Sequence, residues 1–175
     1  MTARPQGLSV RALTKAAFAP FGDVIENADS IGVTAINQGT AQRSDGVAIV
    51  DVDNGRPAIG VVRARARRWP LLVRMLERHP HGSQAFVPLD RHPFVVIAAP
   101  AGLVVEPRQI EAFLAREGQG VNYHKGVWHH PLLAIRDQSV FLVVEREATL
   151  ENCEEFQLPE SEFLLIESPE TTQES

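Results

Sequence analysis

Short apolar runs, separated by turn-forming residues, dominate the chain from residue 33 to residue 166. Runs of roughly four to eight residues, rich in Val, Ile and Phe and bounded by Gly, Pro, Asn or Asp, predict β-strands. Many short strands at close spacing are typical of a sandwich or a barrel. We expect strands at Val33–Asn37, Val47–Val52, Ala58–Ala64, Leu71–Leu76, Ala85–Leu89, Phe94–Ala98, Leu132–Ile135, Val140–Glu145 and Phe163–Ile166.

Helical patterns are few. We expect a short helix over Lys15–Phe18, with Thr14 as its N-cap. A second helix is expected to begin at Pro107 and to end before Gly118, because three apolar residues between them share one helical face. Two isolated helices do not favour a parallel βαβ architecture, so the sequence predicts a mainly β fold with a few short helices.

Length and charge narrow the possibilities further. The 175 residues suit a single domain over residues 1–167, followed by a flexible acidic tail at 168–175. Cys153 is the only cysteine, which excludes an internal disulfide and favours a reducing compartment. The net charge of −5 argues against a nucleic-acid partner. We also expect no membrane span, because no apolar run is long enough, and a cytoplasmic location.

The first group of candidate ligands lies between two predicted strands. Glu77 and His79 are two residues apart, so on an extended strand their side chains point to the same side. Gln84 follows at the start of the next strand, whereas His81 is expected to face solvent. Imidazole nitrogens with carboxylate and amide oxygens suit a divalent ion such as Ni, Mn, Fe or Zn, and the sequence does not choose among them.

A second group gathers three of the six histidines within seven positions. Histidine is both the usual proton carrier near neutral pH and a frequent metal ligand, so this density indicates a reactive pocket. Aromatic residues and a lysine among the histidines can shape and polarise such a pocket. The residues concerned are Tyr123, His124, Lys125, Trp128, His129 and His130.

Two further features favour binding of a small polar substrate. Arg63, Arg65 and Arg67 alternate with apolar residues and should lie on one strand face, where Arg63 could bind a carboxylate through two hydrogen bonds. A solvated sheet face is the simpler interpretation of the same pattern. Asn37 begins a polar loop after a predicted strand. The chain contains no phosphate-binding Gly-Lys-Ser/Thr loop, no Gly-x-Ser-x-Gly nucleophile turn and no cysteine pair for zinc.

The two histidine groups resemble the paired motifs of the cupins, small β-barrels of jelly-roll type with a metal in the barrel mouth. Glu77, His79 and Gln84 stand at the ligand spacings of the first cupin motif, and His129 stands at the ligand position of the second. The resemblance therefore implies a cupin-like antiparallel β-barrel whose metal ligands are these four residues. Glu and Gln replace two residues of the usual motif, which implies a harder ligand set.

More narrowly, the sequence resembles the ureidoglycolate lyase family, also called ureidoglycolate hydrolase, of allantoin degradation. The resemblance extends from about residue 8 to about residue 166. It is most specific in the stretch that contains Tyr123-His124 and Trp128-His129-His130-Pro131. Other matching segments are Phe21-Gly22-Asp23-Val24-Ile25, Ile36-Asn37, Glu77-Arg78-His79-Pro80, Gly82-Ser83-Gln84-Ala85-Phe86, Gly118-Gln119-Gly120-Val121-Asn122 and Asn152-Cys153.

This resemblance implies cleavage of (S)-ureidoglycolate to glyoxylate and urea by a homodimer with nickel, or manganese or zinc, as cofactor. The reaction removes a hydroxyl proton and protonates a departing nitrogen, which is acid–base chemistry. We expect His124, or Glu77 if it is not a ligand, to accept the proton. Tyr123, Lys125 and His130 are unranked candidates for the proton donor. Substrate-binding candidates are Arg63, Asn37 and Trp128.

Two alternatives remain open from the sequence. The same fold hosts many reactions, so another metal-dependent cupin enzyme, such as a dioxygenase or a sugar isomerase, is possible. A non-catalytic cupin that binds a small molecule is the alternative from a different class.

Overall fold

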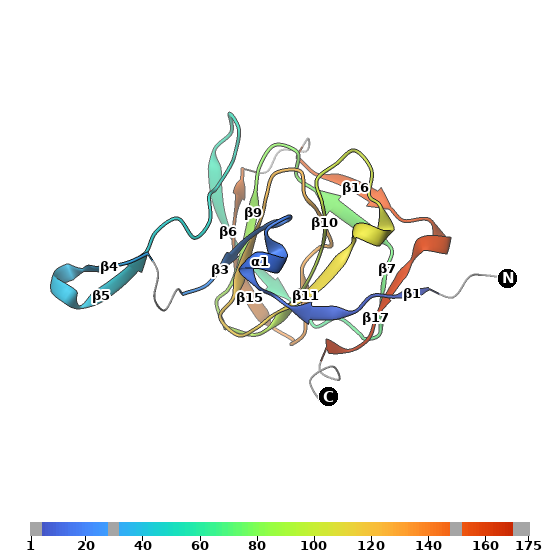
Figure 1. The fold of residues 1–175 in the computed structure, drawn as a ribbon, viewed down its shortest axis with the longest axis horizontal. Helices are drawn as coiled ribbons and strands as arrows, with labels where there is room; N and C mark the ends of the chain where they lie inside the picture. The colour runs from blue at the N-terminus through green and yellow to red at the C-terminus, as the bar shows by residue number, and fades with distance from the viewer. Residues whose placement is uncertain (1–4, 28–31, 148–151, 170–175) are drawn as a thin grey trace.

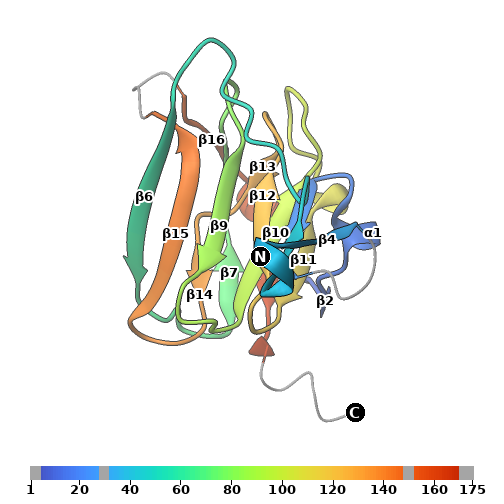
Figure 2. The same cartoon turned by 90° about the vertical axis from the view of Figure 1, so that its left-hand side faces the viewer.

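The computed structural model describes residues 5–27, 32–147 and 152–169, and its β-strands form three layers with a hairpin extending from one side (Figures 1 and 2). The largest sheet, called the central sheet, contains β16 (Glu154–Gln157), β8 (Met75–Arg78), β13 (Trp128–His129), β10 (Phe94–Ala99), β11 (Glu111–Ala115) and β2 (Val10–Ala12), in that order, with β14 (Leu133–Ala134) paired to β10. The second sheet contains β3 (Gly22–Ile25), β12 (Gly120–Tyr123), β9 (Gln84–Pro88), β15 (Ser139–Arg146) and β6 (Pro57–Ala64). A small third sheet contains β1 (Gln6–Gly7), β17 (Leu164–Ile166) and β7 (Leu71–Val73).

Strand β10 lies in the middle of the fold and contributes side chains to the cores on both of its faces. All six of its residues are buried, because it is covered on both faces. Phe94 and Val96 belong to the core between the central and second sheets, whereas Val95 and Ile97 belong to the core that contains residues of the third sheet. A strand with two covered faces needs apolar residues at successive positions, which accounts for its continuous apolar sequence.

The mainly β prediction is confirmed, but the described strands form open sheets packed as a sandwich and not a closed barrel. The arrangement is also not purely antiparallel, because β1 pairs with β17 and β2 pairs with β11 in parallel. Among the described residues, no helix is long and apolar enough to cross a membrane.

The first helix prediction is confirmed and the second is wrong. Helix α1 spans Lys15–Phe18, and the Thr14 hydroxyl accepts a hydrogen bond from the Ala17 amide, as expected for an N-cap. At the second position the structure has a short 3-10 turn, η2 (Pro107–Gln109), followed by β11. Strand β11 is also buried on both faces, and its consecutive apolar residues imitate the spacing of a helix face.

Other differences concern loops and edges. The predicted strand at 47–52 is absent, and these residues belong to a loop between β5 and β6 that crosses the ends of other strands. Strand β6 ends at Ala64, so Arg65 and Arg67 do not continue the predicted alternation. The remaining short 3-10 helix, η3, spans Glu160–Glu162.

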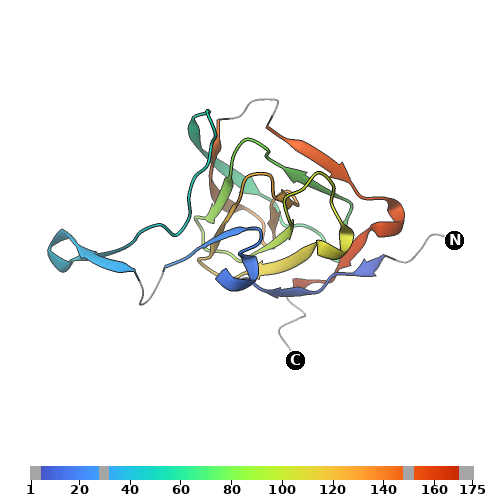
Figure 3. The same cartoon turned by 45° about the horizontal axis from the view of Figure 1, so that its top comes forward.

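A separate hairpin extends from the sandwich (Figure 3). It consists of β4 (Val33–Ile36) and β5 (Ala41–Ser44), joined by the 3-10 turn η1 (Asn37–Gly39). Asn37 and Gln38 in this turn have φ values of 51° and 58°. The tail predicted at 168–175 falls mostly on residues 170–175, which lie outside the described residues, while Pro169 is buried.

Candidate metal centre

A group of polar side chains lies between the central and second sheets, at one end of the sandwich. The central sheet contributes Glu77 from β8 and His129 from β13, which face each other in the ladder between these strands. The second sheet contributes Gln84 from β9, which is opposite Tyr123 on β12 and opposite Glu145 on β15. Three neighbouring ladders therefore bring these side chains together from distant parts of the sequence.

Strand alternation explains why these residues point into the space between the sheets. Leu76 and Trp128 precede Glu77 and His129, and both pack into the core on the opposite face of the central sheet. Because successive side chains on a strand point to opposite faces, Glu77 and His129 face the second sheet. In the second sheet, Gln84 and Phe86 share a face, and Phe86 packs into the core between the two sheets.

The donor atoms converge closely enough to hold one ion. One ligand atom from each of Glu77, His79 and His129 lies within 4.8 Å of the others. The Nε2 atom of His129 is 3.6 Å from a Glu77 carboxylate oxygen and 3.1 Å from the Gln84 carbonyl oxygen Oε1. Three of the four predicted ligands, Glu77, His79 and His129, therefore lie together, and Gln84 contacts His129. Their role as metal ligands stays a prediction.

The hydrogen bonds around the two imidazoles leave lone pairs pointing into the group. Nδ1 of His79 lies 2.6 Å from the Asn152 carbonyl oxygen and Nδ1 of His129 lies 3.1 Å from that of Val127, so each Nδ1–H donates to the backbone. In these tautomers Nε2 carries a lone pair on both rings. The Nε2 atom of His79 is buried and has no hydrogen-bond partner among the described residues.

A metal ion fits these unsatisfied atoms. Nε2 of His129 and Oε1 of Gln84 lie 3.1 Å apart, yet both offer lone pairs when Nδ1 holds the imidazole proton. A shared cation satisfies both atoms together with Nε2 of His79. Backbone carbonyls that accept from the remote nitrogen of a ligating imidazole are a common feature of metal sites.

Burial sets the protonation states in the group. Burial lowers the pKa of His129 to about 3, which keeps the imidazole neutral and available as a ligand near neutral pH. Burial also raises the pKa of the Glu77 carboxyl above its ordinary value. The pKa of the Tyr123 phenol is raised by burial and then by the Glu77 charge, so this residue is a neutral hydrogen-bond donor.

Two side chains complete the group. The Tyr123 ring stacks on the His129 imidazole with 4.1 Å between ring centres and 11° between planes. Glu145 accepts a hydrogen bond of 2.7 Å from Nε2 of Gln84. Sequence reasoning missed Glu145, since a single carboxylate near the end of an apolar strand has the same sequence pattern as a solvated surface residue.

Comparison with known proteins shows the family of the chain. The family model described as ureidoglycolate lyase matches residues 5–165. A ureidoglycolate lyase from Azotobacter vinelandii is 47% identical over 164 residues, which is 93% of this chain and 98% of that protein. Similar proteins of the same name from Burkholderia mallei and Pseudomonas aeruginosa are 50% and 48% identical, covering 90% and 95% of this chain and 92% and 98% of their own lengths. The chain belongs to the ureidoglycolate lyase family.

In this member of the ureidoglycolate lyase family, His124 and Lys125 face a neighbouring pocket. His124 follows β12, and its Nε2 lies 3.1 Å from the Asp23 carboxylate. The pocket is lined by Asp23, Gly46, Ala48, Ile49, Asp51, Ser83, His124 and Lys125. Its lining includes none of the three clustered residues Glu77, His79 and His129.

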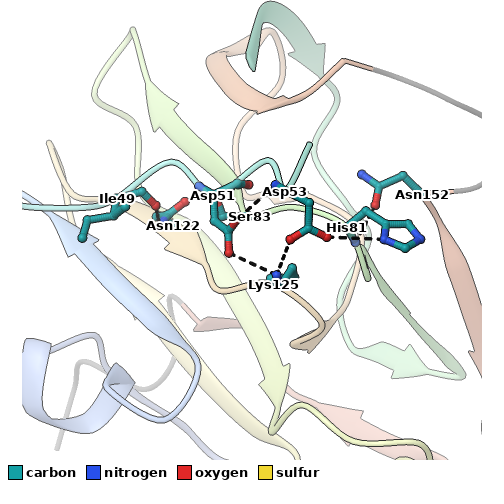
Figure 4. Close-up of polar contacts among 8 residues, drawn as sticks. All are labelled: Ile49, Asp51, Asp53, His81, Ser83, Asn122, Lys125 and Asn152. Atoms are coloured by element: carbon teal, nitrogen blue, oxygen red, sulfur yellow. Dashed lines mark hydrogen bonds and ion pairs between the residues drawn. The ribbon is translucent and has the colours of Figure 1, made fainter. Parts of the chain in front are cut away.

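Lys125 holds the loop between β5 and β6 against this face (Figure 4). Its Nζ lies 2.5 Å from an Asp53 carboxylate oxygen and 3.4 Å from one of Asp51. The Ser83 amide donates to the Asp51 carbonyl oxygen, and His81 lies 3.5 Å from Asp53. These contacts raise the pKa of Lys125, first through its hydrogen bond with Asp53.

Four other residues that the sequence predicted for the site lie outside the group that contains Glu77, His79 and His129. His130 is buried, its Nδ1–H donates to the Pro131 carbonyl, and burial lowers its pKa. Trp128 packs in the other core and donates to the Gly102 carbonyl. Arg63 is exposed beside Gln138, and Asn37 lies in the turn of the extended hairpin. Their predicted catalytic and binding roles therefore have no support from contacts with the group.

Proposed function

We propose that this protein is a divalent-metal-dependent lyase that cleaves (S)-ureidoglycolate to glyoxylate and urea. Membership of the ureidoglycolate lyase family supports the reaction. The observation that carries the metal dependence is the convergence of Glu77, His79 and His129. The Nε2 lone pair of His79 is buried there and has no hydrogen-bond partner in the described part of the chain.

Nickel is the ion that we propose, with manganese or zinc as substitutes. Two imidazole nitrogens and an amide oxygen form a mixed nitrogen and oxygen ligand set, which suits all three ions. We assign His79, His129 and Gln84 as the ligands. A bound divalent ion supplies positive charge that lowers the pKa of a substrate hydroxyl, as it does for water.

The substrate carries a carboxylate, a hydroxyl and a urea nitrogen on one carbon. Cleavage requires a base that takes the hydroxyl proton and an acid that protonates the departing nitrogen. We propose Glu77 as the proton acceptor, because it lies in the group. Its pKa is raised by burial, which makes the carboxylate a stronger base and brings its pKa closer to the working pH. His124 faces the neighbouring pocket with Asp23 and is the alternative acceptor.

Tyr123 is the proton donor that we propose. Its phenol is neutral because burial raises its pKa, and stacking on His129 fixes the ring beside the metal ligands. Lys125, by contrast, is paired with two aspartates, and His130 donates its Nδ1 proton to a backbone carbonyl. We also propose that the enzyme acts in allantoin degradation in the cytoplasm, as a homodimer.

The primary test is release of urea and glyoxylate from racemic ureidoglycolate by purified protein, compared with the uncatalysed decay. We expect equal yields of both products, loss of activity after chelation and recovery with Ni²⁺, Mn²⁺ or Zn²⁺. Activity that survives complete chelation would contradict the metal dependence but not the lyase reaction. Absence of turnover with every ion would contradict the lyase assignment.

The acceptor is tested by comparing E77Q with H124N. We expect E77Q to lower kcat by about a hundredfold or more while Ni²⁺ still binds, because His79, His129 and Gln84 remain. We expect H124N to keep kcat within about threefold, as a variant outside the reacting group. A hundredfold loss in H124N with normal turnover in E77Q would transfer the role to His124. Loss of Ni²⁺ binding by E77Q would make Glu77 a ligand.

A further inference from the structure

The orientation of one side-chain amide determines whether the metal centre is open to a cation. Gln84 can present either its carbonyl oxygen Oε1 or its amide nitrogen Nε2 to His129, because the two ends of an amide have nearly the same shape. With Oε1 inward, Gln84 supplies a ligand. With Nε2 inward, the amide donates a hydrogen bond to the lone pair on His129 Nε2 and occupies the atom that a metal needs.

Glu145 distinguishes these two orientations. Its carboxylate lies 2.7 Å from Nε2 of Gln84, on the side of the amide away from His129. An ionised carboxylate only accepts hydrogen bonds, so it attracts the Nε2 end and repels the Oε1 end. The ladder between β9 and β15 places Glu145 directly opposite Gln84, which fixes the contact through backbone pairing.

We propose that Glu145 is a positioning residue that keeps the Gln84 carbonyl oxygen turned toward His129 and so holds the site ready for a divalent cation. The inference rests on the metal centre proposed above. Glu145 acts through Gln84 and needs no contact with the ion itself. Without an acceptor at this position, the Gln84 amide rotates and donates to His129 Nε2.

The variant E145M tests this role, because methionine has similar length but no acceptor oxygen. We expect metal-free E145M to bind Ni²⁺ about 10- to 100-fold more weakly than the wild type in calorimetric titrations, the range found for residues that orient metal ligands. E145Q keeps an oxygen that can accept from Gln84, so its affinity should stay within about threefold of the wild type. Circular dichroism of the metal-free proteins checks that the variants fold, and E145L replaces E145M if the methionine variant does not.

A matched control separates orientation from charge. Glu155 lies opposite Glu77 in the ladder between β16 and β8 and, like Glu145, acts on Glu77 through its charge. It is exposed and, among the described contacts, does not hydrogen-bond to Gln84. E155M should therefore bind Ni²⁺ within about threefold of the wild type. An equal loss in E155M and E145M would overturn the orientation mechanism in favour of a general field effect.

A double-mutant cycle provides the second test. The variant Q84E offers a carboxylate oxygen in either orientation, so adding E145M to Q84E should cause no further loss of Ni²⁺ affinity. The same loss in both backgrounds, or wild-type affinity in E145M, would overturn the proposal. A wild-type protein that binds neither Ni²⁺, Mn²⁺ nor Zn²⁺ would refute the metal centre itself, a result distinct from the failure of the Glu145 inference alone.

Discussion

Acidification should destabilise the metal-free protein through His129. This residue is 1% exposed, and burial lowers the pKa of its imidazole from an ordinary 6.5 to about 3. In the unfolded chain this residue gains a proton once the pH falls below about 6.5, whereas the folded protein keeps it neutral. The unfolded state then binds more protons, so stability is present above pH 6.5 and is lost progressively as the pH falls toward about 3.

The size of the effect follows from the pKa difference. Well between the two pKa values each pH unit corresponds to about 1.4 kcal/mol. Because the unfolded histidine is already half protonated at pH 6.5, a fall from pH 6.5 to 4.5 should remove about 2.3 kcal/mol through this residue. Glu77 acts in the opposite sense, because its raised pKa lets the folded protein take up a proton more readily than the unfolded chain. The comparison of wild type with H129Q isolates the histidine contribution, since Glu77 is present in both.

The assay is urea unfolding of chelator-treated protein, followed by tryptophan fluorescence at several pH values between 7.5 and 4.5. Between pH 6 and 4.5, the free energy of unfolding of the wild type should fall by about 1.2 kcal/mol per pH unit more steeply than that of H129Q. Parallel curves for the two proteins would refute the reasoning. An NMR titration of the wild type gives an independent check, because a His129 ring proton that titrates near pH 6.5 would contradict the neutral buried imidazole.

Two further predictions concern the core and the loop between β5 and β6. F113A should lower the free energy of unfolding by about 3 to 5 kcal/mol, because Phe113 is fully buried and packs edge-on against Phe18; a loss below about 1 kcal/mol in urea unfolding would contradict this. K125A should speed hydrogen exchange in residues 49–53, because Lys125 pairs with Asp51 and Asp53. Global stability should change little, since these side chains are 35% to 45% exposed. K15A is the control, and equal exchange in K125A and K15A would show that the pairing does not hold the loop.

The sequence predicted most strands correctly where a bounded apolar run fits a strand and no other element. Bounded apolar runs predicted β10 and β15 within one residue at each end, and Thr14 correctly predicted the start of α1. The errors arose where packing overrides local pattern. Strand β11 has both faces covered, which gives it consecutive apolar residues that also fit a helix, and residues 47–52 are apolar but lie in a loop.

The candidate site shows the same difference between what a local pattern predicts and what packing decides. Spacing along the chain grouped Glu77 with His79, because residues two apart on a strand share a face and these residue types suit a divalent ion. The resemblance to the cupin motifs added Gln84 and His129 to the predicted ligands. The sequence predicted His124 as the proton acceptor and Tyr123 as one candidate donor, but it did not show which of these adjacent residues lies beside His129. Strand alternation and pairing place Tyr123 against His129 and His124 against Asp23.

The sequence by itself therefore determined the β class and the family, and it predicted the candidate ligands, since each depends on residue identity and on spacing within short segments. Only the tertiary structure decided which side chains meet. The contact of Glu145 with Gln84 joins residues 61 positions apart and exists because β15 pairs with β9 in one register. A shift of that register by one residue would turn Glu145 to the opposite face of the sheet, so the metal centre depends on strand pairing that no local pattern contains.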